Sequence, residues 1–214
     1  MPLNYENAEP QQDYGLIPIN TLCKIKMEIR QRPDIDELIS AEITKQEREE
    51  EYNWLTPSQT SDAMYLNCEF TIVSEQYNGR KFWGNMVTSG GKTNDQGESI
   101  AGNITKSMLR AIISSGRGLQ PTDMKPGNWV LQNGYPDLFD LEFAVKIGIE
   151  KGKNNYPDKN KILAVITPDK KEYAGIMSGA VQTEKPVQTT APWKDPAPAP
   201  TPNNPTNVPA WGKR

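Results

Sequence analysis

Alternation of apolar and polar residues is clearest in the stretch from Tyr65 to Trp83. Its first part places four apolar side chains on one face of an extended chain: Leu66, Cys68, Phe70 and Ile72. Strict alternation of this kind predicts a half-buried β-strand. Asn78-Gly79 follows, and both residues can adopt the positive φ values of a two-residue type I′ turn. We therefore expect a β-hairpin whose second strand begins after this turn.

The segment from Leu16 to Arg30 predicts a first strand by the same alternation. Its inward positions are apolar, and its outward positions are mostly basic, namely Lys24, Lys26, Glu28 and Arg30. Pro33 ends this strand. Residues Asp34–Trp54 then predict a glutamate-rich helix, which we interpret as part of an acidic insertion of about residues 34–60 between the first and second strands.

A change of period marks the middle of the chain. Apolar residues recur every four positions and predict the apolar stripe of an amphipathic helix: Ile100, Ile104, Met108 and Ile112. This helix starts at Ser99, and Gly116 and Gly118 supply helix-stop chemistry. Alternation returns further on and predicts a strand over Asp140–Glu150, whose inward residues are Leu141, Phe143, Val145, Ile147 and Ile149. A final strand is expected at Lys161–Thr167.

Three strands, a helix and two strands, in this order, are the elements of an OB-fold. This is a five-stranded Greek-key barrel, here with its helix between the third and fourth strands. We expect a mainly β protein with one such domain at residues 15–181, preceded by an N-terminal arm of residues 1–14. Two alternatives share part of the order. An SH3-like barrel would lack the helix, and a ferredoxin-like fold would need one after the first strand, which Asp34–Trp54 could supply.

Residues 182–214 differ in composition from the rest of the chain. They hold eight prolines and almost no branched aliphatic residues. Such a segment cannot form a packed core, so we expect a disordered spacer with a polyproline-like bias. Trp211, close to the end of the segment, is a candidate anchor for a partner protein. A tolerated, solvent-exposed tryptophan explains this residue equally well.

The charge of the chain is unevenly distributed. The 214 residues carry a net charge of −3, which taken alone argues against a polyanion as partner. However, residues 1–66 sum to −7, while residues 67–181 and 182–214 each sum to +2. A nucleic-acid site requires only a local cationic groove. The acidic excess therefore leaves such a partner open.

Several functions lack the residues they need. The sequence has no histidine and two cysteines, so a zinc site and a histidine-activated nucleophile both lack their usual residues. Cys23 and Cys68 fall on apolar faces of predicted strands and are expected to be reduced core residues. The glutamates within residues 47–51 diverge around a helix and cannot converge on one metal ion. We expect no enzymatic activity, no metal and no cofactor.

Neither a signal peptide nor an apolar run long enough to span a membrane is found in the sequence. These observations predict a cytoplasmic protein without membrane contact.

Cations interleaved with aromatic residues form the candidate binding surface. Aromatic rings stack on unpaired bases and cations neutralise phosphates, so the combination suits single-stranded nucleic acid. At the hairpin end, we expect Trp83 to stack on a base and Phe82 to face the core, while Tyr77 could equally be a cross-strand packing partner. Solvated charges are the alternative interpretation of the cations. The candidate contacts are Lys24, Lys26, Arg30, Tyr77, Arg80, Lys81, Trp83, Lys146, Lys151, Lys153, Tyr156, Lys159 and Lys161.

Parts of the chain resemble a known family. These parts are Tyr77-Asn-Gly-Arg-Lys-Phe-Trp83, the Ser99–Gly118 helix with Leu109-Arg110-Ala111, and Phe143-Ala-Val-Lys-Ile-Gly-Ile149 followed by Tyr156-Pro-Asp-Lys-Asn160. In this order they are similar to the phage-encoded single-stranded DNA-binding proteins of OB type, over about residues 15–170. The resemblance implies an OB-fold that binds single-stranded DNA in phage replication and recombination, with replication or recombination proteins as partners of the tail.

Two features depart from that family. The acidic insertion is larger than a bare OB-fold requires, and the chain ends in basic residues where many single-strand binders end in an acidic, partner-binding tip. A second class of function therefore stays open, a structural or interaction scaffold that acts through the acidic insertion and the proline-rich tail. A third class, a nuclease, would require carboxylates clustered in a cleft.

Overall fold

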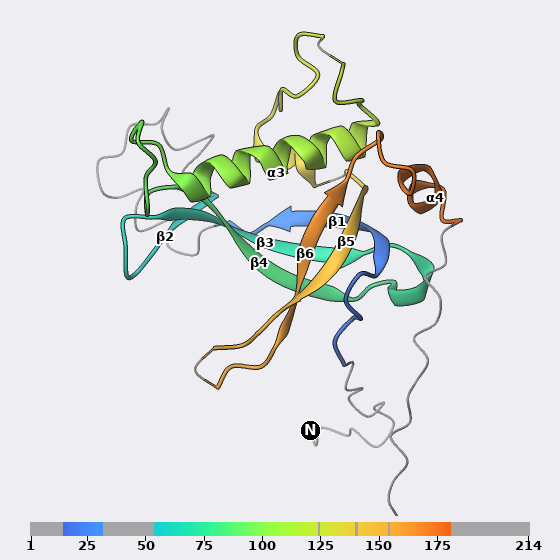
Figure 1. Ribbon diagram of the computed structural model, residues 1–214, viewed down its shortest axis with the longest axis horizontal. Helices are drawn as coiled ribbons and strands as arrows, with labels where there is room; N and C mark the ends of the chain where they lie inside the picture. Colours follow the sequence, from blue (N-terminus) through green and yellow to red (C-terminus); the bar gives the residue numbers. More distant parts are fainter. Residues whose placement is uncertain (1–14, 32–53, 124, 140, 154, 181–214) are drawn as a thin grey trace, which may run out of the picture. The chain divides into compact units, whose positions relative to one another are not determined.

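The fold is mainly β, as predicted. The computed structural model describes residues 15–31, 54–123, 125–139, 141–153 and 155–180. Within these residues, six antiparallel strands form one open sheet, and one main helix, α3 (Ile100–Arg117), lies across it (Figure 1). The strands are β1 (Leu22–Ile29), β2 (Leu55–Pro57), β3 (Met64–Ile72), β4 (Lys81–Ser89), β5 (Phe143–Glu150) and β6 (Lys159–Ile166). The shorter helices are η1 (Glu75–Tyr77), η2 (Tyr135–Leu138) and α4 (Tyr173–Met177).

Strand β3 is central to the pairing of the sheet. It pairs with β4 along one edge and with both β1 and β2 along the other. In turn β1 pairs with β5, and β5 pairs with β6. The prediction of five strands is therefore wrong by one, because β2 lies in the stretch that we had assigned wholly to the acidic insertion. Strand β2 has only three residues, which is too short for an alternation of apolar and polar side chains to distinguish it from a loop.

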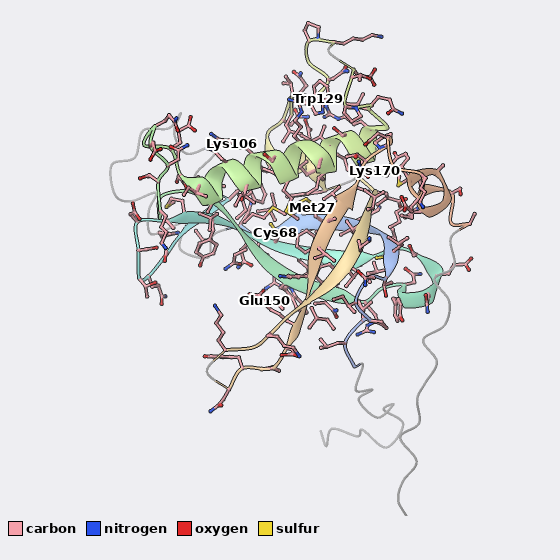
Figure 2. All side chains as sticks on the ribbon, in the orientation of Figure 1. Met27, Cys68, Lys106, Trp129, Glu150 and Lys170 are labelled. Carbon is pink, nitrogen blue, oxygen red and sulfur yellow. The ribbon has the colours of Figure 1, made fainter. Side chains whose placement is uncertain are left out.

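Alternation decides which face of the sheet forms the core. The inward residues of β1 and β3 are buried, and Figure 2 shows Met27 and Cys68 between the sheet and α3. Phe143, Val145 and Ile147 of β5 complete this layer. Both cysteines are free, and burial raises the pKa of each thiol to about 12. The predicted inward faces of β1 and β3 and the reduced cysteines are confirmed. In the predicted strand Asp140–Glu150, Leu141 lies before β5, and both Leu141 and Ile149 are only half-buried.

Helix α3 has the predicted boundaries but a different buried face. Ser99 caps its start by accepting a hydrogen bond from the Gly102 N–H at 3.1 Å, and Gly118 ends it with a φ of 66°. Ile100 and Ile104, however, are 45% and 65% exposed, whereas Ile112 is fully buried. A spacing of four residues drifts by about 40° per step around a helix. The residues predicted to form one stripe therefore cross from the solvent side to the core.

The connection between β3 and β4 is longer than predicted. The hairpin exists, but it closes over residues 73–80, which include η1, rather than over two residues. Asn78 has φ −52° and ψ 134°, Gly79 has φ 79°, and the Arg80 N–H donates to the Tyr77 carbonyl at 3.0 Å. These angles define a type II turn. The predicted type I′ turn is therefore wrong, and half-buried Tyr77 packs against the core within the longer connection.

Several predictions fall outside the described residues. They concern the N-terminal arm, the acidic helix before Trp54, and the segment 182–214 with Trp211. Within the part of the chain that the structure describes, no helix is long and apolar enough to cross a membrane. The same residues contain no group of histidine, cysteine, aspartate and glutamate side chains that could hold a metal ion.

Candidate nucleic-acid interface

The outward face of β1, β3 and β4 carries the hairpin residues that the sequence singled out. The strand register places Glu69 of β3 between Glu28 of β1 and Trp83 of β4. As predicted, Phe82 is buried, at 5% exposure, and Trp83 faces solvent, at 49%. The side chain of Trp83 is therefore an accessible aromatic ring on this face of the hairpin.

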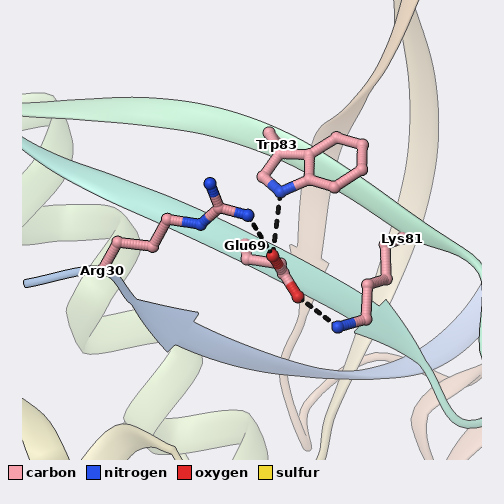
Figure 3. Close-up of polar contacts among 4 residues, drawn as sticks. All are labelled: Arg30, Glu69, Lys81 and Trp83. Carbon is pink, nitrogen blue, oxygen red and sulfur yellow. Dashed lines mark hydrogen bonds and ion pairs between the residues drawn. The ribbon is translucent and has the colours of Figure 1, made fainter.

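Glu69 joins three candidate residues into one cluster (Figure 3). The Arg30 guanidinium donates to Glu69 Oε2 at 2.6 Å, and the Trp83 indole N–H donates to the same oxygen at 2.9 Å. Lys81 donates to Oε1. These three donors, with Lys81 contributing most, lower the pKa of Glu69 to about 2. The carboxylate is thus ionised at neutral pH, and the cluster of Arg30, Glu69, Lys81 and Trp83 carries a net charge of +1.

Trp83 borders two hollows of the surface. The first, which we call the β4–β6 groove, has a volume of about 490 Å³ and reaches the buried side chains Phe70, Phe82 and Met86. The second, the hairpin hollow, has a volume of about 780 Å³ and lies against residues 75–81. Trp83 lines both. Trp83 is therefore the residue that the two hollows share.

Tyr77 and Arg80 form part of the wall of the hairpin hollow. The Arg80 guanidinium carbon lies 5.5 Å from the centroid of the Tyr77 ring, and its nitrogen donates to the Gly15 carbonyl. Tyr77 itself is half-buried. Tyr77 therefore packs against the core, and only part of its ring faces the hollow.

The β5–β6 hairpin supplies cations to the opposite rim of the β4–β6 groove. Lys159 and Lys161 line this groove together with Glu150, which forms an ion pair with Lys159 at 3.4 Å. In the hairpin loop, Lys151 binds Asp158 at 2.7 Å, and this hydrogen bond lowers the pKa of the Asp158 carboxyl group. Lys153 and Tyr156 are exposed in the same loop, and Tyr156 reaches 76% exposure.

Three predicted cations are not grouped with Trp83. Lys24 and Lys26 both pair with Glu142, at 2.6 and 3.9 Å. Lys146 lies opposite Leu22, beside the small apolar cluster that α4 forms on β5 and β6. Leu22 is six residues along β1 from Glu28, a separation of roughly 20 Å. The structure thus divides the predicted contact residues into separate groups. The group around Trp83 and the β4–β6 groove consists of Arg30, Lys81, Trp83, Lys159 and Lys161.

Sequence reasoning missed two features of this site. Glu69 was not singled out, although it occupies an outward position of a strand whose neighbours carry cations. The apolar residues at the base of the β4–β6 groove, including Met108 of α3, were also missed. They become a groove only because β4 and β6, far apart in sequence, lie side by side.

The sequence was compared with protein-family models and with curated proteins. No protein-family model matches the chain, and the curated proteins include no match to it. The resemblance to phage-encoded single-stranded DNA-binding proteins therefore stays a prediction that the residues themselves carry.

Proposed function

We propose that this protein binds single-stranded DNA with little sequence preference, with bases stacked on Trp83 and phosphates held by the surrounding cations. The observation that carries the proposal is the position of Trp83. Its ring is half exposed, and it shares the Glu69 carboxylate with Arg30 and Lys81. Trp83 lines both hollows, and Lys159 and Lys161 line the β4–β6 groove with it. Stacking surfaces within a cationic groove are the usual means of sequence-tolerant single-strand binding.

The order of strand pairing supports the finer proposal of an OB-fold. Its first strand would be β1, its second and third β3 and β4, and its fourth and fifth β5 and β6, with α3 between the third and fourth. An OB-fold is partly open and binds oligonucleotides on the face of its second and third strands and at the loop between its fourth and fifth. Trp83 and the lysine-rich β5–β6 loop occupy these two places. In this assignment β2 is an addition to the barrel.

The hydrogen bond from Trp83 to Glu69 bears on sequence preference. The indole N–H is the only hydrogen-bond donor of a tryptophan side chain, and here Glu69 accepts it. No donor of this side chain remains to read a base edge, whereas every base offers a π-face for stacking. We infer that Trp83 contributes affinity without selecting a base.

The geometry favours an unpaired strand over a duplex. In B-form DNA the base faces are covered by their neighbours, so an aromatic ring can stack only where bases are unstacked. The β4–β6 groove, with lysines on one rim and an aromatic ring on the other, suits a single backbone. A role in protecting and presenting single strands during DNA replication or recombination would follow from this activity.

Photochemical cross-linking tests the proposed contact. A single-stranded oligonucleotide that contains 5-iodouracil, irradiated in complex with the protein, is expected to cross-link to Trp83, because the probe reacts with an aromatic side chain stacked on it. Peptide mass spectrometry identifies the linked residue, and a duplex with the same base serves as control. Cross-links confined to Trp54 or Trp129, or equal yields with the duplex, would contradict the proposal.

A further inference from the structure

Glu69 occupies an unusual position for an acidic residue in a site that is to bind an anion. It lies on the outward face of β3, yet only 8% of the residue is exposed. Three donors from two other segments of the chain converge on its carboxylate: Arg30 after β1, and Lys81 and Trp83 of β4. The carboxylate therefore binds two cations and the indole N–H together.

The two cations differ from Glu69 in their access to solvent. The side chains of Arg30 and Lys81 are 55% and 50% exposed, whereas that of Glu69 is 10% exposed. A phosphate can thus reach the outer sides of both cations, but it meets charges that a carboxylate already partly neutralises. Carboxylate and phosphate oxygens take the same charge-assisted hydrogen bonds from arginine and lysine. Glu69 consequently competes with phosphate for these donors.

The cluster can release a cation without leaving Glu69 unpaired. If a phosphate draws Lys81 away, Arg30 and the Trp83 indole N–H still bind the Glu69 carboxylate. A buried carboxylate stripped of every partner would be costly, and this arrangement avoids that state. The ion pairs can therefore be exchanged one at a time as a strand binds or leaves.

We propose that Glu69 is a built-in competitor of the nucleic-acid backbone, which limits the affinity of the Trp83 site and keeps bound strands exchangeable. This inference rests on the proposed function and deepens it. According to this inference, Glu69 limits the number of phosphates that the cations of the site neutralise. Removal of its charge should free Arg30 and Lys81 for additional phosphate contacts.

The test compares Glu69→Gln with Glu28→Gln in the full chain. Both substitutions remove one negative charge from the same face, because Glu28 and Glu69 are cross-strand neighbours. Glu28 is exposed, and its charge acts on Lys81 only through space. Glu69 is the carboxylate that binds Arg30 and Lys81 directly, so only Glu69→Gln releases both cations. Affinity for a fluorescent oligothymidylate is measured by anisotropy at salt concentrations from 0.1 to 1 M.

We expect Glu69→Gln to steepen the dependence of log affinity on log salt by about 0.7 to 1.4, since each added phosphate contact on a single strand contributes about 0.7. This change corresponds to a gain in affinity at 0.1 M salt, relative to 1 M, of about 5- to 25-fold. Glu28→Gln should leave the slope unchanged. Circular dichroism melts show whether each variant is folded.

The outcomes separate the inference from the proposed function. If the folded Glu69→Gln protein has the slope of Glu28→Gln, or binds more weakly than the unsubstituted protein, the inference is overturned. If the unsubstituted protein does not bind and Glu69→Gln does, the inference stands and the proposed function of the native chain fails. If neither binds, both fail. Should Glu69→Gln unfold, Glu69→Asp keeps the charge on a shorter side chain, and an unchanged slope in that variant would overturn the inference.

Discussion

Replacing Trp83 with alanine is expected to weaken the binding of a single-stranded oligonucleotide by ~1–3 kcal/mol, or about 5- to 150-fold. The substitution removes the stacking surface between the β4–β6 groove and the hairpin hollow. It should affect folding little, because half of the Trp83 side chain is already exposed and Glu69 keeps two charged partners. Anisotropy titrations at one salt concentration measure the loss.

Two further substitutions show whether the ring itself is responsible. Trp83→Phe keeps an aromatic face and should recover part of the lost affinity, whereas Trp83→Leu keeps apolar surface without a π-system and should not. Equal affinities of the Phe and Leu variants would mean that Trp83 contributes only apolar area. A sharp drop in melting temperature with unchanged affinity of the folded fraction would make Trp83 a structural residue instead.

Replacing Ser115 with alanine is expected to cause the largest loss of stability among these variants. The Ser115 hydroxyl is fully buried, donates to the Ile166 carbonyl at 2.8 Å and accepts from the Ala144 N–H at 3.0 Å. It thereby ties α3 to the start of β5 and the end of β6. Alanine would leave two buried backbone groups without partners, at ~1–3 kcal/mol each. Chemical denaturation should show a decrease in the free energy of unfolding of about 2–6 kcal/mol.

Ser107→Ala is the matched control on the same helix. Ser107 is exposed, and its hydroxyl donates to the Asn103 carbonyl within α3 at 3.0 Å. Its removal should change the free energy of unfolding by less than about 0.5 kcal/mol. If the two serine variants proved equally stable, the hydroxyl of Ser115 would not be what holds α3 to the strands.

The sequence predicts the strands well where one face of the sheet is buried. Alternation in β1, β3 and β5 reports the burial of every second side chain, and that burial is observed in the structure. The helix boundaries were also predictable, because Ser99 and Gly118 act through local backbone chemistry. By contrast, β2 and α4 are short, and their formation depends on packing against distant parts of the chain.

The register of the hairpin could not be obtained from its turn. A two-residue turn at Asn78-Gly79 would have paired Trp83 with Ser74, whereas the structure pairs it with Glu69. The difference arises because residues 73–80 form a longer connection in which Tyr77 packs on the core. Turn propensity depends on the local sequence alone. The free energy gained by burying Tyr77 depends on tertiary contacts with the core. For this reason the turn could not show that Glu69 lies opposite Trp83 and joins it to Arg30 and Lys81.

The candidate cations illustrate a second limit of sequence reasoning. Lysines and arginines can be counted from the sequence, but whether they are available depends on which carboxylates approach them. Glu142 takes up Lys24 and Lys26, and Asp158 takes up Lys151. These partners come from a segment far along the chain, just before β5, or from across a loop. The structure therefore reduces a broad basic surface to a smaller one around Trp83 and the β4–β6 groove.

The most direct test of the account is a comparison of single-stranded and duplex DNA. Fluorescent oligonucleotides of equal length, one single-stranded and one duplex, are titrated with the full chain at two salt concentrations. The account predicts that the single strand binds far more tightly, and that its affinity falls as salt rises, because neutralised phosphates release counterions. Equal affinity for both forms, or single-strand binding that does not depend on salt, would contradict it.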